Sequence, residues 1–347
     1  MPSGAHEHEA IPSGATMQQS ASRGQRRLVR LMAALLLVSG IIAFSYTSVS
    51  VTIAALMAYM PPEPITETPA ALGLAYRNVA FTSREDHLLL RGWFIPGVLP
   101  DGRLTAKRTI IVVHGAGSNR ADPSSGLLTL EGALARRGFA VLAFDMRGMG
   151  QSTPAPFTYG YFEQRDVLGA VDFLRSGVPP YPALGHPQAI GGLGFSMGAN
   201  VLLLAAAREP AIRAVVADSA YADPVAIVYD ELPRHSGLPA VMTPGVLLAA
   251  HVLYGVDFYG IRPLDAVARL APRPVLFISG TADTIIRASN TQRLAHAADA
   301  TPDAHVQRWL VLGAGHAQSF DTAPTEYVNR VATFFTAALG PDTTAHA

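Results

Sequence analysis

The pentapeptide Gly194-Phe195-Ser196-Met197-Gly198 constrains the fold more than any other feature of this sequence. It has the form G-x-S-x-G and lies between residues 188–193, an apolar run typical of a buried strand, and residues 199–208, a run typical of a helix. The flanking glycines leave room for a tight strand-to-helix turn that projects the serine hydroxyl from the backbone. The first N–H groups of the helix then point toward any negative charge that develops there. The pattern predicts that Ser196 is a nucleophile.

From about residue 76 onward, short apolar runs alternate with helical stretches. Residues 79–82 and 87–94 predict an opening antiparallel pair of strands. Because alternating strands and helices form parallel sheets that helices cover on both faces, the sequence predicts an α/β fold with a mostly parallel sheet. The further predicted strands are residues 109–113, 139–144, 212–217, 275–279 and 306–312, and the further predicted helices are residues 127–137, 162–175, 290–298 and 327–339.

Residues 221–261 interrupt this alternation. They are rich in Pro, Leu, Tyr and Val. An insertion at this point would lie above the strand ends, where open parallel sheets bind ligands, so the segment predicts a small apolar lid. The alternative interpretation is ordinary packing of helices at the sheet edge. A second membrane span is disfavoured because Pro244 and His251 interrupt a short run.

The N-terminal region contains a long uncharged segment. Residues 1–30 predict a disordered tail, whereas residues 31–60 carry no charged side chain and follow a group of arginines. Thirty helical residues would measure roughly 45 Å, against ~30 Å for the apolar core of a bilayer, so about 20 of them suffice to span it. The segment therefore predicts a transmembrane helix or signal anchor, and the protein is expected to contact the membrane through it.

The arginines before this segment favour a cytoplasmic N-terminus and place the rest of the chain outside the cytoplasm. The alternative is a secreted protein whose signal peptide is cleaved near Ala43-Phe44-Ser45. A buried helix of a soluble protein is a third interpretation. A Pro-rich linker is predicted at residues 61–75, the main domain at residues 76–340 and a C-terminal tail at residues 341–347.

The composition narrows the classes of function. Lys plus Arg and Asp plus Glu number 26 each, so no global field favours nucleic acid as a partner. The chain has no cysteine, which excludes disulfides, thiolate chemistry and Cys-ligated zinc, but leaves the cellular compartment open. His and acidic residues with the spacing of metal ligands are not found outside the tail motif His6-Glu7-His8-Glu9. No metal or other cofactor is expected.

A serine hydroxyl is a weak nucleophile, so Ser196 needs a base and the base needs a carboxylate. His316 follows the last strand in a Gly-Ala-Gly-His turn, and Asp283 follows the preceding strand. The alternatives are a surface loop for His316 and an Asx turn for Asp283. Asp218 and Asp223 are the fallback carboxylates. The predicted triad of Ser196, Asp283 and His316 has the chain order typical of α/β hydrolases.

Backbone N–H groups are expected to bind the oxyanion of the tetrahedral intermediate. One is the N–H of Met197, directly after the nucleophile. The second is expected from the small-residue turn 114–119, with Ala116 as the predicted donor and Gly117 as the alternative. His114 in the same turn is a weaker candidate for the base. The glycine-rich loop at residues 145–152 is interpreted as a structural turn.

Together these residues resemble the α/β-hydrolase superfamily, over roughly residues 76–339. The landmarks are the 114–119 turn, the Asp145-Met146-Arg147-Gly148 loop, the Ser196 elbow and Gly315-His316. Residues 162–167 and the short insertion are similar to the serine aminopeptidase-like and dienelactone hydrolase-like groups. The resemblance implies an esterase, an acyl-lipid hydrolase or a peptidase, and leaves the substrate open.

These observations predict a membrane-anchored serine hydrolase that cleaves an acyl ester or thioester through an acyl-enzyme. A small-molecule or lipid acyl substrate is the expected partner. A serine peptidase or amidase of the same fold is the alternative within enzymes. A non-catalytic binding protein is a further alternative, which predicts that the triad is broken, and all three of its positions are intact in this sequence.

Overall fold

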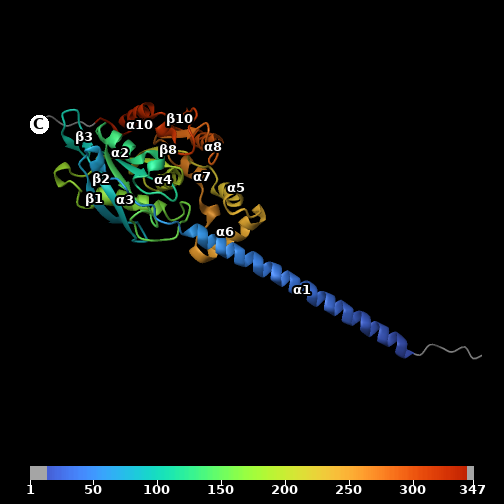
Figure 1. Ribbon diagram of the computed structural model, residues 1–347. Helices are drawn as coiled ribbons and strands as arrows, with labels where there is room; N and C mark the ends of the chain where they lie inside the picture. The colour runs from blue at the N-terminus through green and yellow to red at the C-terminus, as the bar shows by residue number, and fades with distance from the viewer. Residues whose placement is uncertain (1–13, 342–347) are drawn as a thin grey trace, which may run out of the picture.

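A computed structural model describes residues 14–341 of the protein, with side chains from residue 24 onward. Its centre is one eight-stranded sheet (Figure 1). The strands, in spatial order, are β1 (Arg77–Thr82), β2 (Leu89–Ile95), β6 (Ala140–Phe144), β5 (Arg108–Val113), β7 (Ala189–Phe195), β8 (Ile212–Asp218), β9 (Val275–Gly280) and β10 (Val306–Val311). The pairs β1–β2 and β2–β6 are antiparallel and all later pairs are parallel, as predicted.

Helices cover both faces of this sheet. Successive side chains of a strand point to opposite faces, so Ile111 and Val113 enter one core while Ile110 and Val112 enter the other. α3 (Gln164–Ser176), α4 (Met197–Arg208), α7 (Pro263–Ala268) and α8 (Ala288–Asp299) pack on the first core, and α2 (Leu127–Ala135) and α10 (Pro324–Leu339) pack on the second. The short hairpin β3 (Gly97–Val98) and β4 (Leu104–Thr105) is a separate sheet that the sequence did not predict.

The insertion between β8 and α7 is helical. It contains α5 (Pro224–Ser236) and α6 (Thr243–Tyr254), which pack on a third apolar core together with residues 54 and 258. Residues 240–254 and 258–268 would together be long and apolar enough to cross a membrane, but they meet at 92°. α6 instead lies beside the domain end of the N-terminal helix, and α5 packs on the same core (Figure 1).

The N-terminal helix α1 (Gly14–Ala58) extends from the domain as a single rod (Figure 1). Its segment 24–58 is long and apolar enough to cross a membrane. The prediction of a disordered tail over residues 1–30 is wrong for residues 14–30, because this Ala-, Gln- and Arg-containing stretch continues the turns of the apolar helix. The remainder of that tail, residues 1–13, and residues 342–347 of the C-terminal tail lie outside the described residues.

The C-terminal third of α1 packs against α6. The Tyr46 hydroxyl donates a hydrogen bond to the Val241 carbonyl (3.0 Å) and accepts one from the Gly245 N–H (3.0 Å). A Cβ atom at Gly245 would lie 2.3 Å from the Ser50 Oγ, so the two helices approach closely because this residue is glycine. The buried residues of this face recur every four positions, at Ser50, Ala54 and Ala58.

The segment after α1 lies along the domain. The Asn119 Nδ2 donates to the Glu63 carbonyl (3.1 Å), and the Arg136 Nη2 donates to the Leu72 carbonyl (2.6 Å). Ile65 packs on the core beneath α2 and α10. Residues 61–75, predicted to be a Pro-rich linker, are therefore fixed to the domain at several points.

Candidate active site

Ser196 occupies a strained turn between β7 and α4. Its φ and ψ are 52° and −120°, a conformation that residues with a Cβ rarely adopt, and its N–H donates to the Asp218 carbonyl (2.8 Å). The glycines on either side allow close backbone approach. A Cβ at Gly198 would lie 2.2 Å from the His114 carbonyl oxygen, and one at Gly194 would lie 2.5 Å from the Gly198 carbonyl oxygen. The G-x-S-x-G pattern thus forms a nucleophile elbow.

The three side chains of the predicted triad lie in one hydrogen-bonded series. The His316 Nε2 is 2.8 Å from the Ser196 Oγ, and the His316 Nδ1 is 2.8 Å from the Asp283 Oδ2. Because the carboxylate only accepts, the network assigns the proton to Nδ1 and leaves Nε2 free to accept from the serine. The second oxygen of Asp283 accepts from the N–H groups of Ile285 (3.0 Å) and Ile286 (2.8 Å), so this residue forms an Asx-type turn and orients His316 as well.

The topology explains how residues so far apart in the sequence meet. Ser196 follows β7, Asp283 follows β9 and His316 follows β10. These strands are parallel, so their carboxyl ends lie at one edge of the sheet, where open α/β sheets bind ligands.

The fallback carboxylates have other partners. Asp218 is buried and accepts from the hydroxyls of Ser219 (3.0 Å) and Ser319 (3.1 Å). Burial raises the pKa of Asp218 to about 6, against the lowering effect of these hydrogen bonds. The Ser219 Oγ also accepts from the Ala317 N–H (3.1 Å), which links Asp218 to the loop that carries the histidine. Asp223 instead caps the first turn of α5.

His114, the weaker candidate for the base, is buried and fixed at both ring nitrogens. Its Nε2 accepts from the Met146 N–H (3.1 Å), so its Nδ1 carries the proton and donates to the Gly115 carbonyl (2.8 Å). Burial lowers the pKa of His114 and favours this neutral ring. The side chain therefore holds the 114–119 turn against the loop after β6.

The predicted oxyanion donors lie beside the serine. Met197 begins α4, and Ala116 lies in a turn where a Cβ at Gly115 would be 3.7 Å from the Ser196 Cβ. Among the described residues, neither the Met197 nor the Ala116 N–H has a hydrogen-bond acceptor. Gly117, the alternative donor, has a φ of 69°. The oxyanion roles stay predictions, and both N–H groups are available for them.

The loop after β6 is a structural turn, as interpreted from the sequence. The Asp145 carboxylate accepts from the Arg120 N–H (2.8 Å), the Arg120 Nη1 (2.5 Å) and the Gln151 N–H (2.8 Å). Arg147 is paired with the buried Asp166 (2.7 Å). Within residues 24–341, whose side chains the structure describes, no group of His, Asp and Glu side chains has an arrangement that could hold a metal ion.

A cavity of about 870 Å³ opens onto Ser196 and His316. The 114–119 turn lines it, and its apolar walls come from the insertion predicted to be a lid and from α1, which sequence reasoning did not connect with the site. Those walls are formed by Ile53, Met57 and Met60 of α1 and the following residues, and by Ile227, Val228 and Leu232 of α5. The insertion thus lies over the site, in the position predicted for a lid.

Comparison with known proteins identifies the fold. The family model described as the alpha/beta hydrolase fold matches residues 108–243. The chain has the α/β-hydrolase fold. This α/β hydrolase is similar to a solved structure of the Pyrococcus furiosus esterase Pf2001, with 26% identity and a TM-score of 0.65 over 82% of this chain and 99% of that one. The assignment of this chain to the serine aminopeptidase-like or dienelactone hydrolase-like group stays a prediction.

Two bacterial relatives have sequences similar to this α/β hydrolase. The uncharacterized protein YfhR of Escherichia coli K12 is 30% identical over 62% of this chain and 66% of its own length. YfhR of Salmonella typhi is 29% identical over 62% of this chain and 68% of its own length.

Proposed function

We propose that this α/β hydrolase is a serine esterase that cleaves an acyl ester through an acyl-enzyme. The observation that carries the proposal is the continuous hydrogen-bonded series from Ser196 through His316 to Asp283, at the mouth of a largely apolar cavity. The similarity to the Pf2001 esterase supports ester hydrolysis. The apolar walls favour an acyl group over the polar backbone of a peptide substrate.

In the first half-reaction, the Ser196 Oγ attacks the ester carbonyl carbon while His316 Nε2 takes the hydroxyl proton. Asp283 holds the imidazolium that forms. The N–H groups of Met197 and Ala116 bind the oxyanion. The carbon–oxygen bond to the leaving group then breaks, and His316 returns its proton to the departing alkoxide, leaving an acyl group on the serine.

In the second half-reaction, water takes the place of the alcohol. His316 removes a proton from the water, whose oxygen attacks the acyl carbon and forms a second oxyanion in the same site. Breaking the bond to Ser196 Oγ releases the carboxylic acid, and the histidine proton returns to the serine.

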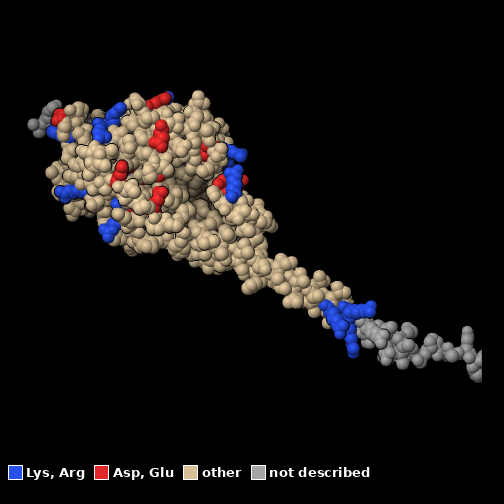
Figure 2. All heavy atoms as spheres, in the orientation of Figure 1, with Lys and Arg blue, Asp and Glu red and all other residues tan. Residues whose placement is uncertain are grey.

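We propose further that α1 anchors the enzyme in a membrane, with a cytoplasmic N-terminus and the domain on the other side. The support is the uncharged apolar rod, with arginines at the end remote from the domain (Figure 2). Secretion after cleavage of the apolar segment is the alternative.

The first experiment compares labelling of the protein and of its Ser196→Ala variant by a fluorophosphonate probe. We expect labelling only with the serine present, and a loss of ester turnover by several orders of magnitude in the variant. Both residues carry a Cβ, so the strain of the turn and the thermal stability should be similar. Full activity of the variant would refute the proposal. A preference for aminoacyl amides over acyl esters would favour the peptidase.

A further inference from the structure

The end of α1 that meets the domain forms part of the cavity that contains Ser196. We infer that Ile53 and Met57 of α1, together with Met60 just after it, bind the long acyl chain of the ester substrate, so that the anchor helix belongs to the substrate-binding site. The inference rests on the proposed esterase function and names its substrate class.

The helix end is held close to the reacting groups. The Phe157 N–H donates to the Ala58 carbonyl, at the last residue of α1, over 2.7 Å. The Met60 sulfur is 3.1 Å from the position that a Cβ at Gly117 would occupy, in the turn that carries the predicted oxyanion donor. An acyl chain attached to Ser196 would therefore pass along α1 as soon as it leaves the reacting carbon.

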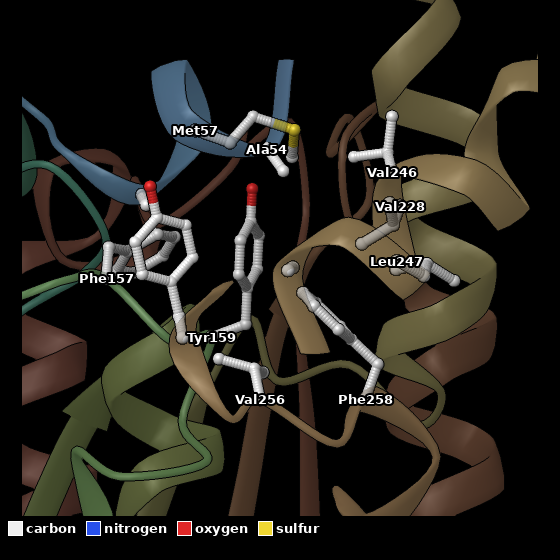
Figure 3. A pocket seen from close by; sticks show the side chains of 12 residues that line it. Ala54, Met57, Phe157, Tyr159, Val228, Val246, Leu247, Val256 and Phe258 are labelled. Carbon is white, nitrogen blue, oxygen red and sulfur yellow. The ribbon is translucent and has the colours of Figure 1, made fainter. Parts of the chain in front are cut away.

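Apolar space continues beyond this cavity, between α1 and α6. Met57, Tyr159 and Val228 line both the large cavity and a narrower void of about 20 Å³ behind it. Figure 3 shows this void, with Met57 and Ala54 on one side and the insertion residues opposite. Its other walls are entirely apolar or aromatic, among them Val246, Leu247, Val256 and Phe258. The two spaces together outline an apolar course that leads away from the serine.

The large cavity also has polar lining residues. Glu63, Asp122 and Ser124 line it, as do Glu231 and His235 of α5, whose side chains are 3.1 Å apart. A cavity lined by both apolar and polar side chains suits an amphiphilic ester. Its acyl chain lies along α1, and its polar alcohol part faces the carboxylates and water.

The position of α1 also indicates where such a chain comes from. About 20 helical residues cross the apolar core of a bilayer, so a span that begins after Arg30 ends near Ser50, within about one turn of the first cavity residue, Ile53. The adjoining α6 has no charged residue, and its Leu248, Val252 and Leu253 are exposed. An acyl chain that leaves the bilayer beside α1 thus meets apolar surface as far as the cavity.

The test measures kcat/KM for acetyl, octanoyl and palmitoyl esters of one chromogenic alcohol, with the full-length protein in phosphatidylcholine vesicles. The key variant is Met57→Trp, which fills the junction of the two apolar spaces. Its control is Leu36→Trp, an exposed position of the same helix that lines neither space. We expect the wild type and the control to prefer palmitoyl, and the palmitoyl-to-acetyl ratio of Met57→Trp to fall about tenfold or more.

A loss of equal size on all three esters would overturn the inference, since Met57 would then matter only for the structure of the domain. A wild type without preference for longer chains would overturn it too. If Met57→Trp fails to fold, Ile53→Trp carries the same expectation. Fluorophosphonate labelling distinguishes failure of this inference from failure of the proposed function. Labelling without chain-length preference would refute only this inference, whereas absence of both labelling and hydrolysis would refute the proposed esterase function.

A second arm addresses the source of the ester. The palmitoyl ester is placed either in the vesicles that carry the enzyme or in separate vesicles. Faster hydrolysis in the shared vesicles supports entry from the bilayer, and equal rates from both would overturn that route.

Discussion

Asp218 is the last residue of β8 and Asp283 follows β9, and their hydrogen-bond partners give them different roles. Asp283 accepts from the His316 Nδ1, whereas Asp218 accepts from two serine hydroxyls. A residue that orients the base must contact the ring and be ionised when the imidazolium forms. Asp283 meets the contact requirement. Burial raises the pKa of Asp218 to about 6, which disfavours its ionised form.

We predict that Asp283→Asn lowers kcat about 10⁴-fold, because an amide would favour the wrong tautomer of His316. Asp218→Asn should lower kcat less than about tenfold, since the amide oxygen still accepts hydrogen bonds from Ser219 and Ser319. Steady-state kinetics on one ester, with thermal melts as a check on folding, would compare the two. A larger loss from Asp218→Asn than from Asp283→Asn would reverse the assignment.

At the scale of residues, sequence reasoning located side chains whose positions follow from strand ends. Ser196, Asp283 and His316 each come directly after a predicted strand, and parallel strands bring their carboxyl ends together. It could not identify Met57 and Ile53 as lining residues. Their contact with the cavity depends on how a long helix packs against an insertion, and an apolar helix has the same sequence whether it faces lipid or protein.

Among the elements, α2 carries an acidic residue in its buried face. Glu131 is completely buried, and neither of its oxygens has a hydrogen-bond partner among the described residues. Burial raises the pKa of Glu131 well above its usual 4.5, and the nearby positive charge of Arg120 opposes that effect only in part. The packing of α2 on the sheet therefore includes a carboxyl group that the fold favours in its protonated form.

This feature predicts a pH-dependent effect of Glu131→Gln on stability. The folded protein holds the proton of Glu131 more tightly than the unfolded chain does. The contribution of this proton to the free energy of unfolding is therefore complete below pH 4.5 and is lost as the pH rises through the raised pKa. The glutamine side chain cannot ionise, so the free energy of unfolding of the variant should exceed that of the wild type by about 1 kcal/mol or more near neutral pH, and by little in acid. Denaturant unfolding at several pH values measures the difference. Glu67→Gln, at an exposed position, is the control, and a pH-independent difference would contradict the prediction.

Most strands of the sheet could be predicted because they are short apolar runs, and α3, α8 and α10 because each has one apolar face. α5 and α6 could not be placed within residues 221–261. Pro233 lies inside α5, and α6 is apolar around much of its surface, so neither shows the pattern of a single buried face. Their apolar surface is divided between the third core, the cavity and α1.

At the scale of the whole molecule, the distribution of charged residues favours one orientation of α1 across a membrane. The arginines at residues 26–30 lie at the far end of α1, and an uncharged rod separates them from the domain (Figure 2). An orientation with these arginines in the cytoplasm follows the positive-inside rule. The sequence predicted this arrangement, but not that the last turns of α1 would be buried against α6.

The absence of cysteine from the sequence allows a direct test of this orientation. Thr325→Cys introduces one thiol at an exposed position of the domain, and Gln25→Cys introduces one at the opposite end of α1. We expect a membrane-impermeant maleimide to label Thr325→Cys in intact cells and Gln25→Cys only after permeabilisation. The reverse result would place the domain in the cytoplasm.

The hydrogen bonds of Tyr46 have a consequence for proteolytic shedding. The candidate cleavage site at Ala43-Phe44-Ser45 lies just before this residue, so cleavage after Ser45 would leave the contacts of Tyr46 with Val241 and Gly245 in place. A shed enzyme would also keep Ile53, Met57 and Met60, which line the cavity. Removal of the first 45 residues would then change where the enzyme meets its substrate and leave its selectivity as it was.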